Sequence, residues 1–233
     1  MTTYKRSYFL YFIVIFLYWD IIVTNNIISC LLWGVLLWFI MSTPLQKLNP
    51  NILVFTLFLG LFFIQRIFFD LIQDSTIAFA ASFLYLPHGL RVLATLIGGR
   101  KIILGLFLGH IFSGIYMHLI ANDIGMSFSD LLNLKTSIII MLTSIGSSFC
   151  VLLALFILRI NSSDIRSITL KTLLIVSILS SIINSFFSNT VYFLSYENWE
   201  IGIQFIQYII GDLIGTLLIF YILKFSKKMI KYE

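Results

Sequence analysis

Long, continuous apolar runs fill most of the chain, and only short polar stretches separate them. The runs are rich in Leu, Ile and Phe, and most are close to the length of about 20 residues that a helix needs to cross a bilayer. They lack the alternating segments of about ten residues that build transmembrane barrels. The pattern predicts an all-α, polytopic transmembrane helical bundle of about eight spans, over residues 7–24, 27–43, 52–73, 76–98, 102–121, 136–159, 168–194 and 202–225.

Composition supports membrane insertion of the whole chain. Hydrophobic residues make up 60% of it and charged residues 11%, whereas soluble domains are about 45–50% apolar and roughly 25% charged. No linker, repeat or low-complexity segment divides residues 1–233, so we expect a single integral membrane domain. No small-residue cleavage site follows Trp19 and Asp20, which favours a retained first helix over a signal peptide.

The net charge of +5 is distributed like a topology signal. With eight spans and the N-terminus inside, the outer loops hold a single basic residue, Lys135, and basic residues in loops favour the cytoplasmic side. We therefore expect both termini in the cytoplasm of a cell with an inner membrane, and lipid rather than nucleic acid as the basic residues' partner. Twelve basic residues fall on the cytoplasmic side: Lys5, Arg6, Lys47, Arg100, Lys101, Arg159, Arg166, Lys171, Lys224, Lys227, Lys228 and Lys231.

Residues 85–101, YLPHGLRVLATLIGGRK, place polar and helix-breaking residues inside an apolar run. Pro87 removes a backbone donor and Gly89 lets the chain bend. The pattern predicts a fourth helix that is kinked or broken at Pro87, with these two residues as a structural hinge near mid-bilayer. Half-helix ends at that depth recur in membrane binding sites. The alternative is a proline kink that neighbouring helices pack.

Charges inside spans are costly and need a partner or water. Arg91 and Asp212 lie at similar predicted depth on the fourth and eighth spans, so we expect them to pair, either as a scaffold or as part of a site. His88, His110 and Asn184 add polar groups at comparable depth, and these five residues are the candidate ligand-binding set. The histidines lack a carboxylate cluster, so no metal is expected.

Other polar residues and the cysteines have simpler interpretations. Arg66 and Asp70 are four residues apart on one helical face, which favours a local ion pair over a share in an outward-facing ligand site. Asp20 is expected at the membrane interface. Cys30 and Cys150 are expected to be small packing residues rather than a disulfide or a metal site.

Two small-residue pairs predict close helix packing. Gly105 and Gly109 form one GxxxG motif, and Gly211 and Gly215 form another around the candidate Asp212. Their positions favour a tight cluster of the fourth, fifth and eighth helices.

Two stretches resemble the first family of membrane-associated sensor domains, the MASE family. The run FLYLPHGLRVLATLIGGRKIILGLFLGH (83–110) is similar to a family signature, and YIIGDLIGTLLIFYIL (208–223) is similar to its closing helix. The resemblance implies a sensory or ligand-receiving module of bacterial inner membranes, of the kind that precedes histidine kinase, diguanylate cyclase or phosphodiesterase domains. No such output domain follows here, so we expect a separate output protein. The matching residues are Pro87, Gly89, Arg91, Gly99, Arg100, Gly105, Gly109, Gly211, Asp212 and Gly215.

The leading hypothesis is a sensor-type module that binds a small ligand or partner protein through the polar core. The alternative is a small transporter, or the substrate-binding subunit of one with other transporter subunits as partners. No Ser–His or paired-Asp motif is present, so the chain is not expected to be an enzyme, and no cofactor is expected. The pattern leaves the ligand and the oligomeric state open.

Overall fold

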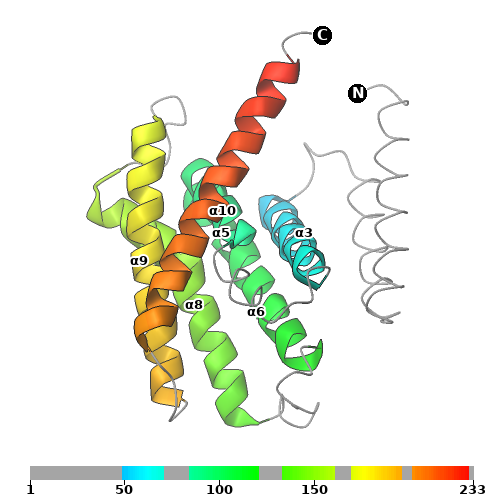
Figure 1. Ribbon diagram of the computed structural model, residues 1–233, viewed down its shortest axis with the longest axis vertical. Helices are drawn as coiled ribbons and strands as arrows, with labels where there is room; N and C mark the ends of the chain where they lie inside the picture. The colour runs from blue at the N-terminus through cyan, green and yellow to red at the C-terminus, as the bar shows by residue number, and fades with distance from the viewer. Residues whose placement is uncertain (1–48, 71–83, 121–132, 161–168, 196–200, 231–233) are drawn as a thin grey trace. The chain divides into compact units, whose positions relative to one another are not determined.

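The computed structural model describes residues 49–70, 84–120, 133–160, 169–195 and 201–230, and all its elements there are helical. They belong to one compact unit, Pro50–Glu233. The first two predicted spans, with Asp20 and Cys30, lie outside the described residues, as do the side chains of Arg66 and Asp70. The helices are α3 (Pro50–Asp70), α5 (Leu86–Gly98), the 3-10 turn η2 (Gly99–Ile102), α6 (Ile103–Ile120), α8 (Leu134–Ile157), α9 (Leu170–Ser195) and α10 (Ile201–Ile230) (Figure 1).

Four stretches of described helix are long and apolar enough to cross a membrane. They are Leu86–Met117, Leu134–Ile157, Leu170–Ser195 and Gly202–Ile222, and Pro50–Gln65 is a shorter apolar helix. The expected helical, membrane-spanning class is therefore observed, while the count of eight spans stays a prediction.

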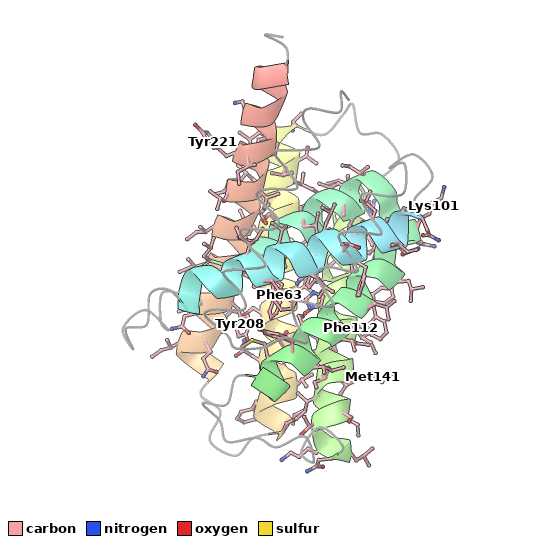
Figure 2. The ribbon with its side chains drawn as sticks, turned by 90° about the vertical axis from the view of Figure 1, so that its right-hand side faces the viewer. Phe63, Lys101, Phe112, Met141, Tyr208 and Tyr221 are labelled. Atoms are coloured by element: carbon pink, nitrogen blue, oxygen red, sulfur yellow. The ribbon has the colours of Figure 1, made fainter. Side chains whose placement is uncertain are left out.

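Polar side chains are frequent among the buried residues, and large apolar side chains are frequent among the exposed ones. Along α9 the buried positions are Ser and Asn as well as Leu and Val, whereas Ile182 and Phe186 are exposed. Phe112, Met141 and Tyr221 likewise point away from the helices that carry them and are at least half exposed (Figure 2). Large exposed apolar surfaces of this kind fit a lipid environment rather than water.

The helices pack pairwise in a closed order: α3 on α6, α6 on α8, α8 on α9, α9 on α10, α10 on α5, and α5 on α3. α5 also contacts α8 and α9, so it has the most neighbours and is the most buried helix of the set. α3 lies across α5 and α6 (Figure 2). The polar residues that α5 carries are therefore surrounded by helices.

The predicted kink at Pro87 is not observed; a helix begins there instead. Leu84 and Tyr85 are not helical, α5 starts at Leu86, and Pro87 lies in its first turn. The first amides of a helix have no intrahelical partner, so proline costs nothing at this position and its fixed φ favours the helical start. The residues that precede Leu84 in the predicted fourth span, 76–83, lie outside the described residues.

α5 is too short to cross a bilayer by itself. Its 13 residues extend about 20 Å, against a hydrocarbon core of about 30 Å. The helix ends at Gly99, whose φ of 57° and ψ of −134° suit only glycine, and whose N–H donates to the Thr95 carbonyl. η2 and α6 follow directly.

Candidate functional site

The start of α5 is hydrogen-bonded to the interior of α10. Tyr85 N–H donates to the Gly211 carbonyl at 3.0 Å. Asp212, the next residue, lies within the apolar stretch Gly202–Ile222, which is long enough to cross a membrane. α5 therefore begins beside the interior of this stretch and not at its end.

Glycines permit this attachment. The Tyr85 carbonyl lies where a side chain at position 215 would begin, and a Cβ added at Gly89 would lie 2.6 Å from the Gly215 carbonyl oxygen. α3 contributes as well, because the Gln65 side chain accepts the Leu86 N–H at 2.8 Å. Two neighbouring helices thus bind backbone amides at the α5 start, which lipid could not do.

The GxxxG motifs pack as close contacts, but not as the single cluster we expected. Gly211 and Gly215 pack against the α5 start, whereas Gly105 faces the backbone of Asn51 and Gly109 faces the Phe58 ring, both on α3. The Asn51 side chain also accepts the Gly105 N–H at 2.9 Å. The reason is the position of α5: it runs beside α10, and the glycine face of α6 is covered by α3.

Arg91 is fully buried, and its bonded partners are all neutral. Its Nη1 lies 3.1 Å from His88 Nδ1 and donates to Cys150 Sγ at 3.4 Å. Its Nη2 lies 2.7 Å from His110 Nε2, and the Tyr85 ring centroid is 5.9 Å from its guanidinium carbon. A guanidinium has no acceptor, so each imidazole must present a lone pair to it.

Asp212 contacts the same imidazole from the other side. Its Oδ2 lies 3.2 Å from His88 Nδ1 and accepts from Asn184 Nδ2 at 2.9 Å. The expected direct pair of Arg91 with Asp212 does not form, because His88 lies between them. The two charges instead belong to one network.

α8 and α9 complete this network. Ser180 Oγ and Ser181 Oγ lie 3.2 and 3.3 Å from His88 Nε2, and Ser147 donates to Asn184 Oδ1 at 2.7 Å. Five helices therefore contribute to it. We call it the polar cluster: His88, Arg91, His110, Ser147, Cys150, Ser180, Ser181, Asn184 and Asp212.

All five residues predicted as a ligand-binding set are brought together in the polar cluster. Sequence reasoning missed the roles of Ser147 and Gln65, and it treated Cys150 only as a packing residue. Cys150 does pack in an apolar cluster with α5 and α9, but its sulfur also accepts from Arg91. The serine positions had a signal, since Ser and Asn recur at spacings of three and four along α9; Cys150 had none.

Within the part of the chain that the structure describes, one atom of each charged group in the polar cluster has no hydrogen-bond partner. These atoms are Arg91 Nε and Asp212 Oδ1, and both are buried. Buried polar atoms without partners are rare and costly. One orphaned donor and one orphaned acceptor in the same cluster mark it as a place where bonding can change.

Comparison with family models, with curated proteins and with solved structures finds no match to this chain.

Proposed function

We propose that the chain is an integral membrane sensor-type module whose polar cluster receives a small ligand or a partner protein and sets the position of α5. The observation that supports this most is that α5 starts beside the interior of an apolar stretch of α10 and not at its end. A helix that begins there is bound to its neighbours through a few specific contacts rather than along a full span. A change in those contacts can therefore move it.

The route from the cluster to the membrane surface is short. Arg91 occupies the second turn of α5, and the helix ends at Gly99, where η2 carries the exposed Arg100 and Lys101. A change in the bonds of Arg91 would tilt or shift α5 and carry η2 with it. Shifts of about 1–2 Å are a common form of signalling between packed helices.

The location and partner of the module follow from charge and from the MASE resemblance. We propose eight spans in a bacterial inner membrane with both termini in the cytoplasm, and signalling to a separate histidine kinase or cyclase. Exposed basic residues near the helix ends support this orientation, namely Arg100, Lys101, Arg159, Lys171 and Lys224. Reporter fusions after Asn51 and Lys231 should behave as cytoplasmic and one after Asp130 as external; an external C-terminus would contradict the topology.

One observation favours a transporter as the second candidate. Beyond Asn184, the buried face of α9 continues with Ser185, Ser188 and Asn189, so polar groups extend from the cluster toward the end of the helix. Such a stripe could line a substrate path. Flux of a substrate through proteoliposomes that hold the purified chain alone would support this candidate over the sensor.

Distance measurement between two spin labels tests the sensor proposal. Labels at Lys101→Cys and Lys171→Cys, both exposed positions, would be placed in a Cys30→Ser background and measured by double electron–electron resonance in nanodiscs. Asp212→Asn should shift the distance by about 1–2 Å. Ser148→Ala is the matched control, because Ser148 is equally buried but bonds only to its own helix.

A distance that Asp212→Asn leaves unchanged in a folded protein would identify the polar cluster as a scaffold. If Asp212→Asn does not fold, Asn184→Leu, which removes a donor to the same carboxylate, replaces it.

A further inference from the structure

His88 Nδ1 faces two groups with opposite requirements. Arg91 Nη1, which can only donate, lies 3.1 Å away, and Asp212 Oδ2, which as a carboxylate can only accept, lies 3.2 Å away. One ring nitrogen carries either a lone pair or a proton. Without a further proton it can therefore satisfy one of these two neighbours but not both.

The serines on the other side of the ring assign its tautomer. Ser180 and Ser181 hydroxyls lie 3.1 and 2.7 Å from the Ser177 carbonyl oxygen, to which both donate. A hydroxyl that donates to the Ser177 carbonyl does not donate to His88 as well, so this arrangement favours a ring proton on Nε2, and the donation from Arg91 to Nδ1 requires it. Nδ1 then holds the lone pair that accepts from Arg91.

This tautomer leaves two acceptors in contact. The Nδ1 lone pair and the Asp212 carboxylate face each other at 3.2 Å, which is a hydrogen-bond distance without a hydrogen. Among the described residues, Asn184 supplies the one hydrogen-bond donor to Oδ2, and Oδ1 has no partner. A single added proton converts this repulsive contact into a hydrogen bond, as N–H to carboxylate or as carboxylic O–H to the ring nitrogen.

We infer that His88 Nδ1 and Asp212 Oδ2 form a proton-binding site, and that the bound proton competes with Arg91 for the His88 lone pair. This inference rests on the proposed function and names the ligand of that site. The proton comes from water and returns to it, and no other bond is made or broken.

The release of Arg91 has a defined result. Its Nη1 keeps the hydrogen bond to Cys150 on α8, and its Nη2 keeps the hydrogen bond to His110 on α6. Once the hydrogen bond to His88 is broken, the guanidinium shifts toward these two helices. α5 would then lose a bond between its own first and second turns and keep its contact with Asp212. Proton binding thus changes how α5 is attached to its neighbours.

The other groups around the site would modulate the proton affinity. The described side chains of α3 include no titratable group. The titratable or charged side chains that interact with Arg91, His88 or Asp212 are Tyr85 beside α5, His110 on α6, Cys150 on α8 and Tyr208 on α10, and Tyr192 on α9 interacts with Tyr85 and Tyr208.

Nitrogen NMR of ring-labelled histidine in nanodiscs tests the inference. The chain has three histidines, and His118→Gln leaves the signals of His88 and His110. From about pH 8 to about pH 5, His88 should begin as the Nε2–H tautomer and gain a proton at Nδ1, or an infrared carbonyl band of protonated Asp212 should appear. His110 is the internal control: its Nε2 should stay unprotonated because Arg91 donates to it at 2.7 Å.

Asp212→Asn should abolish the infrared band and lower the proton affinity of His88 by about tenfold or more, since the nearby opposite charge is gone. If neither signal changes with pH in the wild type, or if His88 titrates equally in Asp212→Asn, the proton site is refuted. The proposed function is tested separately by the spin-label distance, and it is refuted if Asp212→Asn leaves that distance unchanged. An unchanged NMR spectrum together with a shifted distance would leave a sensor module whose ligand is not a proton.

Discussion

Gly215→Ala tests whether α5 begins against α10. The Tyr85 carbonyl oxygen occupies the place of the added methyl, and real Cβ atoms essentially never lie within 3.0 Å of another heavy atom. The start of α5 must therefore move away. That movement strains the two hydrogen bonds that hold the α5 start, Tyr85 to Gly211 at 3.0 Å and Leu86 to Gln65 at 2.8 Å.

The cost follows from these two contacts. A neutral hydrogen bond contributes about 0.5–1.5 kcal/mol, so Gly215→Ala should lower the free energy of unfolding by about 1–3 kcal/mol. The measurement is reversible unfolding by SDS in detergent micelles. Gly202→Ala is the control on the same helix: an added Cβ there meets nothing within 4 Å, and alanine should leave stability unchanged or raise it by up to about 1 kcal/mol. Equal stability of the two variants would refute the close approach.

Three further predictions use the same unfolding measurement. Ser147→Ala should cost about 1–2 kcal/mol more than Ser148→Ala, because Ser147 donates to the polar cluster across helices and Ser148 to its own helix; equal costs would contradict the network. Gly99→Ala should cost about 1–3 kcal/mol, since its backbone region is essentially restricted to glycine, and an unchanged midpoint would contradict that backbone assignment. Arg91→Gln combined with Asp212→Asn should cost about 1–3 kcal/mol less than the sum of the single changes, because His88 couples the two charges; additive costs would show that they act independently.

Helix positions in the described part of the chain were predictable because hydropathy records which segments can face lipid. The predicted spans 136–159 and 168–194 correspond to Leu134–Ile157 and Leu170–Ser195. The start of α5 at Leu86 was not predicted as such. A proline in an apolar run fits two structures equally well: Pro87 could kink a continuous helix, or it could lie in the first turn of a new helix. Only the neighbouring contacts of Tyr85 decide between them.

The candidate site was predictable in its charges but not in its bonds. Arg91 and Asp212 stand out because charges are expensive inside apolar segments. Their depth can be counted along each span, but their direction around the helix axis relative to other helices cannot. The sequence therefore indicated a direct pair, whereas His88 lies between them. Cys150 was missed for the same reason, since its contact with Arg91 depends on how α8 packs.

The distance between the labels at Lys101→Cys and Lys171→Cys, followed as the pH falls from about 8 to about 5, tests the central claim that the protonation state of the polar cluster positions α5. Asparagine at position 212 is uncharged at every pH, like the protonated form of Asp212. The account predicts that the wild-type distance moves on acidification toward the Asp212→Asn value, and that the Asp212→Asn distance itself does not change with pH. A wild-type distance that stays constant, or an equal pH-dependent change in both proteins, would contradict it.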